Sequence, residues 1–126
     1  MSRSEEHKNL PVPHINLNTK ESLLILEGRC IPADPTWFCD ALTQLTSGYI
    51  LLQGRLRCQI KLEYFNSAST RALVQFLKML EDHKAKGASI SVEWFYEIDD
   101  EDSVDFARDL IDLMELQIEL IPLKSM

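Results

Sequence analysis

The sequence has no apolar run long enough to cross a membrane. Its longest runs, SLLIL at 22–26 and YILL at 49–52, fall far short of the ~20 residues that a membrane-spanning helix needs. The N-terminus, MSRSEEHKNLPVPH, is charged and polar where a secretory signal would carry an apolar stretch. We therefore expect a cytoplasmic protein that does not insert into membranes.

Cysteine is scarce, and the chain has an odd number of cysteines, three. Cys30, Cys39 and Cys58 stand nine and nineteen residues apart, without the C-x-x-C pair that zinc sites and redox dithiols use. We expect all three to be reduced residues that fill space in the core. We also expect no metal and no cofactor.

Positive charge is in short supply as well. The chain has 13 lysines and arginines against 20 aspartates and glutamates, which gives a formal net charge of −7. Nucleic acids and anionic membranes are bound by basic surfaces, so this balance opposes both kinds of partner. A protein partner, with a basic surface of its own, fits the charge better.

The sequence also lacks the motifs of common enzymes. Of its three histidines, His7 and His14 lie near the N-terminus, and His83 lies about four helical turns beyond Ser67, the serine discussed below. No G-x-S-x-G elbow, glycine-rich phosphate loop or H-E-x-x-H motif occurs. We expect no enzymatic activity and assign no catalytic residue.

The composition is that of one globular domain. With 126 residues, 45% hydrophobic and 26% charged, the chain is large enough to bury a real core. Residues 1–13 carry two prolines and many charges without periodicity, which predicts a flexible N-terminal tail. The domain itself is expected over residues 14–123.

Its first half reads as a hairpin followed by a helix. The β-prone runs INL and SLLILEG flank a turn at 18–21. Asp34-Pro35 is a helix-start signal, and the helix is expected to run to about residue 52 before Gly54 stops it. The apolar stripe predicted for this helix consists of Phe38, Ala41, Leu42 and Leu45.

Its second half alternates strands with helices. Alternating side chains predict strands at 56–62 and 89–97, and the chain closes with a strand at 117–121. Amphipathic helices are expected between them, one after the junction NSAS at 66–69 and one after the acidic turn IDDED at 98–102. This order predicts an α/β fold, with a mixed, mostly parallel sheet and helices packed on it.

The NSAS junction lies at the carboxyl end of a predicted strand, where α/β folds place functional residues. Ser67 most simply caps the following helix. The hydroxyls of Ser67, Ser69 and Thr70 also lie where free N–H groups and the helix dipole favour a phosphate, and Arg71 could hold a phosphate or a partner's carboxylate. The residues alone are compatible with both roles, a helix cap and a phosphorylation site.

Two further features have simple structural interpretations beside functional ones. The acidic stretch at 97–102 lacks the ligand spacing of a calcium loop and is expected to be a solvated helix start capped by Asp99 or Asp100, although it could dock a basic partner. Trp94 and Tyr96 should pack in the core. Phe95 points the other way, and it would belong to an exposed patch if the sheet has an open face.

The run YFNSAS, the amphipathic helix after it, Gly87, the strand SVEWFYE and the acidic turn together resemble the SiaC family of bacterial regulatory phosphoproteins. The resemblance covers about residues 15–121. It implies a single domain similar to the STAS domain of anti-anti-sigma factors, which works by partner switching. It also implies three partners: a serine/threonine kinase, a PP2C-type phosphatase, and a diguanylate cyclase that the unphosphorylated form binds and activates, raising cyclic di-GMP and promoting biofilm formation.

The same resemblance assigns the site. The phosphorylated residue of the family directly follows the asparagine of a Y-L-N-T-S-S-like motif, which makes Ser67 the expected phosphorylation site, with Ser69 and Thr70 as fallbacks. Tyr64, Asn66, Ser69 and Arg71 are the expected partner-binding residues.

The motif departs from the family pattern in two ways. Serine stands at 67 where threonine is usual, and Ala68 replaces the next serine. The anti-anti-sigma pattern D-S-x-G is not matched, since Asn66 and Ser69 stand at its aspartate and glycine. Two alternatives remain: an anti-anti-sigma-type switch protein, and a constitutive interaction subunit without phosphorylation control.

Overall fold

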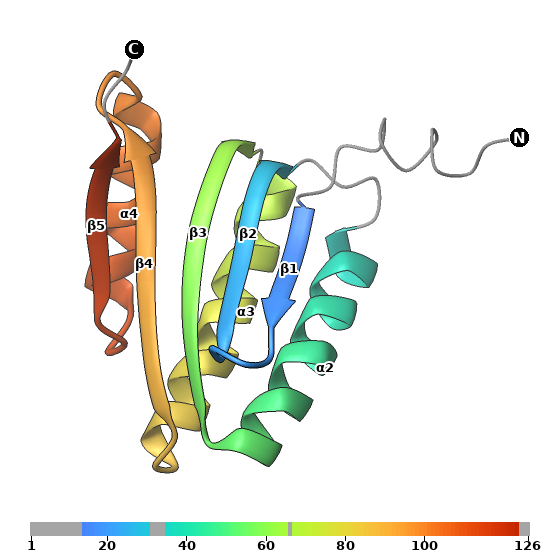
Figure 1. Cartoon of the computed structure of the whole chain (residues 1–126). Helices are drawn as coiled ribbons and strands as arrows, with labels where there is room; N and C mark the ends of the chain where they lie inside the picture. Colours follow the sequence, from blue (N-terminus) through green and yellow to red (C-terminus); the bar gives the residue numbers. More distant parts are fainter. Residues whose placement is uncertain (1–13, 31–34, 66, 124–126) are drawn as a thin grey trace, which may run out of the picture.

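The structure, a computed structural model, describes residues 14–30, 35–65 and 67–123. It forms a five-stranded sheet with the order β1-β2-β3-β4-β5 and three helices (Figure 1). The strands are β1 (His14–Asn18), β2 (Leu23–Cys30), β3 (Arg55–Phe65), β4 (Ser89–Glu97) and β5 (Ile118–Leu123). The helices are α2 (Pro35–Gln53), α3 (Ser67–Ala85) and α4 (Glu101–Leu113). The α/β prediction is confirmed, and the predicted flexible tail at 1–13 lies outside the described residues.

The sheet is mixed and mostly parallel, as expected. β1 pairs antiparallel with β2, and the carboxamide of Asn18 accepts the backbone N–H groups of Lys20 and Glu21 at 3.0 and 3.2 Å, which closes the hairpin turn. The pairs β2–β3, β3–β4 and β4–β5 are parallel. The carboxyl ends of β2, β3 and β4 therefore meet at one edge of the sheet, here called the carboxyl edge.

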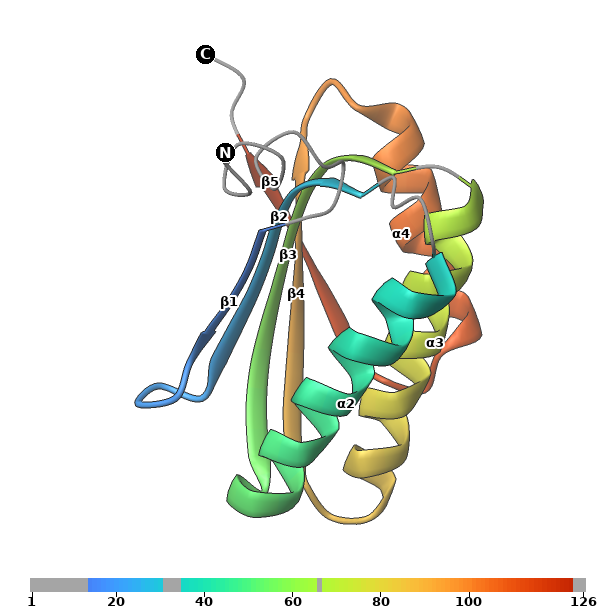
Figure 2. The same cartoon turned by 90° about the vertical axis from the view of Figure 1, so that its right-hand side faces the viewer.

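All three helices cover the same face of the sheet (Figure 2). The core lies between them and the strand side chains that point inward, among which Leu26, Cys58, Ile60 and Trp94 are at most 1% exposed. Trp94 also meets Phe106 of α4 edge-on, with ring centroids 5.6 Å apart. Each helix is held on the sheet because its apolar side chains pack into this one core layer.

Among the described residues, no helix covers the opposite face of the sheet, here called the open face (Figure 2). Trp94 is buried and Tyr96 packs against the core, whereas Phe95 is partly exposed on the open face. The ammonium group of Lys61 lies 4.9 Å from the centre of the Phe95 ring, a cation–π contact between β3 and β4.

The predicted stripe of α2 was half wrong. Phe38 and Leu42 are buried, but Leu45 is 50% exposed and Ala41 is exposed as well. The core face instead contains Cys39, Thr46 and Ile50. Apolar residues surround this helix on every side, so spacing alone could not tell the buried face from the exposed one.

Cys39 and Cys58 are free and buried, as predicted, whereas the side chain of Cys30 lies outside the described part of the structure. Burial raises the pKa of the Cys58 thiol to about 12, because the apolar core disfavours the thiolate. No helix in the described ranges has the combination of length and apolarity that a membrane span needs.

Candidate functional site

The predicted phosphorylation site lies at the carboxyl edge, next to the middle strand of the sheet. β3 ends at Phe65 and α3 begins at Ser67, so a single residue joins them. Asn66 is that residue and lies outside the described part, as do the side chains of Tyr64, Ser67 and Ser69. Their backbones place Ser67 and Ser69 in the first turn of α3 and Tyr64 at the end of β3.

Two residues of the predicted site have described side chains. Thr70 is partly buried and makes contacts of its own, whereas Arg71 is exposed. The first turn of α3 contains no acidic residue, so the positive end of the helix dipole is not offset there by a carboxylate. This is the electrostatic setting in which an added phosphate is favoured.

An irregularity in the sheet immediately precedes the site. Gly28 pairs with Leu62, but Arg29 pairs with Tyr64, so β3 carries one extra residue, Glu63, at this point. Gly28 has a φ of 103°, a conformation that side-chain-bearing residues rarely adopt. Such bulges redirect a strand and are common beside functional sites.

The sheet also divides at this edge. The β3–β4 ladder ends at the pair Ile60–Trp94, although β3 continues to Phe65 and β4 to Glu97. Over these last residues β3 pairs with β2, and β4 pairs with β5 (Figure 1). The end of β3 that leads to Ser67 is therefore supported by the β2 side of the sheet.

The start of α2 lies beside the start of α3 (Figure 2). The thiol of Cys39 lies 3.5 Å from the carbonyl oxygen of Ala72 and 3.3 Å from the side-chain oxygen of Gln75. These contacts hold the early turns of the two helices together on the core side.

The acidic turn forms the third part of this edge. The carbonyl oxygen of Asp100 accepts the N–H of Val104 at 3.3 Å, which makes Asp100 the N-cap residue of α4, as one of the two predicted caps. Glu97, Asp99 and Glu101 are exposed around it. Across the described residues, no three His, Cys, Asp or Glu side chains gather closely enough to hold a metal ion.

His83 is far from the serine cluster. It lies in the last turn of α3, sixteen residues beyond Ser67 or about 24 Å along the helix axis, and its Nε2 lies 2.8 Å from Ser47 Oγ of α2. Within the described residues, this histidine therefore ties two helices together and is too distant to serve Ser67 as a base.

The comparisons with known proteins agree with this geometry. The model of the SiaC family of regulatory phosphoproteins matches residues 5–123. This chain is a member of the SiaC family. No curated protein matches the sequence significantly.

Three solved structures share the fold of this SiaC-family chain. The diguanylate cyclase SiaD in complex with its activator SiaC from Pseudomonas aeruginosa matches with a TM-score of 0.83 and 17% identity, over 91% of this chain and 95% of that chain. Apo-SiaC from Pseudomonas aeruginosa matches with a TM-score of 0.77 and 18% identity, over 86% and 89%. A further structure of SiaC from Pseudomonas aeruginosa gives 0.73 and 18%, over 93% of each chain.

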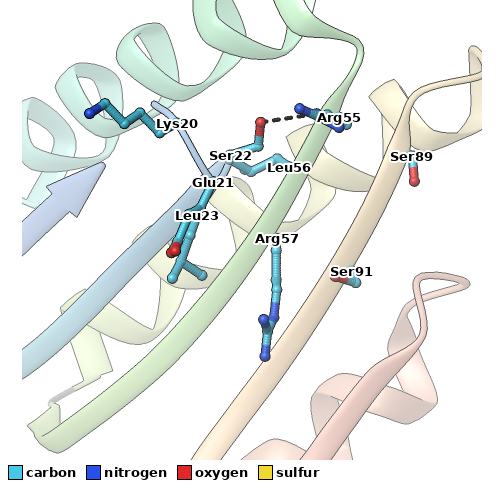
Figure 3. Close-up of a pocket in the computed structure, with 9 residues that line it drawn as sticks. All are labelled: Lys20, Glu21, Ser22, Leu23, Arg55, Leu56, Arg57, Ser89 and Ser91. Atoms are coloured by element: carbon cyan, nitrogen blue, oxygen red, sulfur yellow. Dashed lines mark hydrogen bonds between the residues drawn. The ribbon is translucent and has the colours of Figure 1, made fainter. Parts of the chain in front are cut away.

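The SiaC-family chain has a polar depression at the opposite edge that sequence reasoning missed. It measures about 550 Å³ and lies where β2, β3 and β4 begin, lined by Lys20, Glu21, Ser22, Leu23, Arg55, Leu56, Arg57, Ser89 and Ser91 (Figure 3). Ser22 is 4% exposed and has a φ of 54°, which is unusual for a residue with a side chain. No local motif marks it, because its partners come from distant segments.

The groups at the two ends of the hydrogen-bond chain through Ser22 determine which group donates in each bond. Arg55 Nε can only donate, and it lies 3.2 Å from Ser22 Oγ. Ser22 Oγ lies 2.6 Å from the Tyr49 hydroxyl, which donates to the Thr19 carbonyl at 3.1 Å. Since the Tyr49 proton is used there, the Ser22 hydroxyl donates to Tyr49. One directed chain of bonds thus joins β3, the hairpin turn and α2.

An ion pair extends from this depression onto the open face. Arg57 Nε lies 2.8 Å from Glu93 Oε1, which also accepts a hydrogen bond from Gln59 at 3.1 Å. The hydrogen bond from Arg57 holds the pKa of Glu93 below its usual value, against a smaller opposing effect of burial. The same contact raises the pKa of Arg57. Arg57 is thus paired with Glu93 and Arg55 is bonded to Ser22, so both arginines of the depression link neighbouring elements of the fold.

Proposed function

We propose that this SiaC-family protein is a non-enzymatic switch, in which reversible phosphorylation of Ser67 controls binding to, and activation of, a diguanylate cyclase. A serine/threonine kinase adds the phosphate and a PP2C-type phosphatase removes it. The unphosphorylated form raises cyclic di-GMP and promotes biofilm formation.

The position of Ser67 carries this proposal. It is the first residue of α3, separated from the middle strand by a single residue, in a turn without acidic side chains. A phosphate adds nearly two negative charges at one point and three strong acceptor oxygens. The backbone N–H groups of the first turn are available to it because a helix start leaves them without intrahelical partners.

The nearby charges support a switch by repulsion and desolvation. The acidic turn with Glu97, Asp99 and Glu101 begins α4 at the same edge. A phosphate on Ser67 would add to this negative charge, and a partner surface that fits the uncharged serine would have to desolvate it. Arg71, exposed one turn along α3, is the proposed neighbour of the phosphate.

Relatives with the same fold support the choice of partner. In Pseudomonas aeruginosa, SiaC is described as the activator of the diguanylate cyclase SiaD and forms a complex with it. Because the identity is 17%, the likeness itself shows only the fold, and the partner is proposed for this chain through its family membership.

The experiment compares three variants of the purified chain in binding to the diguanylate cyclase of the native cell and in cyclic di-GMP synthesis from GTP. Ser67→Ala should bind and activate as the unphosphorylated wild type does, and Ser67→Asp should lose both. Ser89→Asp is the matched control, since it adds the same charge on an exposed residue at the opposite edge.

Mass spectrometry of the protein from cells locates the phosphate and distinguishes Ser67 from Ser69 and Thr70. Equal cyclase binding by Ser67→Ala and Ser67→Asp would refute the switch. Equal loss in Ser67→Asp and Ser89→Asp would show that net charge alone matters, which would also refute it.

A further inference from the structure

The polar depression where β2, β3 and β4 begin carries positive charge in an acidic chain. Its charged lining residues are three cations and one carboxylate: Lys20, Arg55, Arg57 and Glu21. The ion pair of Arg57 with Glu93 lowers this excess without removing it, whereas the whole chain has a formal net charge of −7. A local field of this sign attracts anions from solution.

Small side chains of β4 leave room for the depression beside the arginines of β3. Arg57 pairs in register with Ser91, and Arg55 pairs with Ser89 (Figure 3). Both serines are exposed, and their side chains are much shorter than those of the arginines. The hollow measures about 550 Å³, within the range of roughly 300–1,000 Å³ that is typical of small-molecule sites. Its size therefore suits a small molecule.

The depression offers mainly hydrogen-bond donors. Arg55 and Arg57 are bonded through Nε alone within the described residues, so the terminal nitrogens of both guanidinium groups keep donors for a ligand. Lys20 adds an exposed ammonium group, and Ser91 adds a hydroxyl. Phosphate oxygens only accept hydrogen bonds, and the planar guanidinium group matches their geometry. This set of donors fits a phosphate group better than a neutral molecule.

Ser22 fixes one of the arginines at a cost to the backbone. In the described ranges it is the one residue other than glycine with a positive φ, 54°, and it is 4% exposed. Its hydroxyl oxygen accepts a hydrogen bond from Arg55 Nε at 3.2 Å, and its proton is donated to the Tyr49 hydroxyl at 2.6 Å. Strained backbone and buried polar groups that orient a surface side chain are typical of binding sites, where they hold donors in place before a ligand arrives.

We infer that this depression binds the phosphate group of a small phosphorylated molecule. Arg55, Arg57 and Lys20 supply the charge, and Ser22 acts as a positioning residue for Arg55. The net charge of the chain opposes nucleic acids, which need an extended basic surface. Free phosphate and a nucleotide share the required chemistry, and the experiment separates them. The inference does not rest on the proposed function, because the depression lies at the edge of the sheet opposite to Ser67.

The test measures the binding of ATP and of inorganic phosphate to the purified full chain by isothermal titration calorimetry at low salt, where screening is weak. Arg55→Gln is compared with Arg108→Gln, a matched control that removes the same charge from an exposed arginine of α4. Arg55→Gln should weaken binding at least about tenfold, because it removes charged hydrogen bonds, and the control should bind as wild type does. Tighter binding of ATP than of phosphate supports a nucleotide, and equal binding supports free phosphate.

NMR locates the site. Titration with ATP should shift the backbone amide signals of residues 20–23, 55–57 and 89–91, which line the depression. Shifts at the start of α3 instead would place the anion beside Ser67 and overturn the inference. So would the absence of saturable binding of either probe at millimolar concentration, equal weakening by Arg55→Gln and Arg108→Gln, or binding of acetate as tight as that of phosphate.

A double-mutant cycle tests the role of Ser22. Ser22→Gly keeps every charge and suits the positive φ, but it removes the bond that orients Arg55. It should weaken ATP binding in the wild-type background and have no further effect in the Arg55→Gln background, because it acts through that arginine. Additive losses, or unchanged ATP binding by Ser22→Gly alone, would overturn the positioning role.

Discussion

The hydrogen-bond chain at Ser22 leads to a stability prediction that can be worked from the structure. Ser22→Ala removes the bonds to Tyr49 and Arg55. Each intramolecular hydrogen bond contributes about 1 kcal/mol net, so we expect a loss of about 2 kcal/mol in the free energy of unfolding. Ser91→Ala, on an exposed serine of the same depression, is the control and should change it by less than about 0.5 kcal/mol.

A second substitution at the same position isolates the backbone. Ser22→Gly loses the same two bonds, but the φ of 54° disfavours a residue with a Cβ by about 1–2 kcal/mol relative to glycine. The glycine variant should therefore be about 1 kcal/mol more stable than the alanine variant, even though glycine usually destabilises. Tyr49→Phe provides the coupled partner, and a double-mutant cycle with Ser22→Ala should show a coupling of about 1 kcal/mol.

Urea unfolding followed by tryptophan fluorescence is the assay, because Trp94 is 1% exposed and reports loss of the core. At a urea m-value of about 2 kcal/mol/M, the loss expected for Ser22→Ala lowers the midpoint by about 1 M. A glycine variant less stable than the alanine variant would refute the argument from φ. Strict additivity of Ser22→Ala and Tyr49→Phe would refute the directed chain.

Three further outcomes follow from single contacts. Thr46→Val should raise the free energy of unfolding by about 1 kcal/mol in urea, because the Thr46 hydroxyl is buried and has no hydrogen-bond partner among the residues that the structure describes; a less stable variant would show that the hydroxyl is satisfied. Because the pKa of Glu93 is lowered, its pair with Arg57 stabilises the fold above the usual glutamate value of 4.5 and loses this effect as the pH falls below it, so wild type and Arg57→Gln should converge in stability in acid. Cys58, with a pKa of about 12, should resist iodoacetamide at pH 8 in the folded protein and react in urea, as peptide mass mapping would show.

The sequence predicts an element well where the residues of its buried side differ clearly in polarity from those of its exposed side. The strand predicted at 89–97 matches β4, because its side chains alternate between a buried and an open face. The helix α2 shows the opposite case. Its location was predicted, but only half of its buried face was, since the exposed Ala41 and Leu45 are apolar like the buried Phe38 and Leu42. Residues 35–53 contain a single charged residue, Asp40, so polarity did not mark the exposed face either.

The candidate site was likewise predictable only in part. The position of Ser67 at a strand end and helix start follows from local pattern, and the structure has it there. Its neighbours depend on which strands adjoin and which face the helices cover. These are tertiary choices, so the nearness of α2 and the chain from Arg55 to Thr19 through Ser22 could not be predicted. Phosphorylation at Ser67 and the partner-binding roles of Tyr64, Asn66, Ser69 and Arg71 remain predictions.

The early end of the β3–β4 ladder at Ile60 and Trp94 has a consequence for motion in the native state. Beyond that pair, β1, β2 and β3 form one leaf of the sheet, and β4 and β5 form the other. We expect native-state hydrogen exchange to resolve the leaves as two cooperative units with different opening free energies. Ser67 belongs to the first leaf and the acidic turn to the second, so a bound partner that contacts both should slow exchange in each.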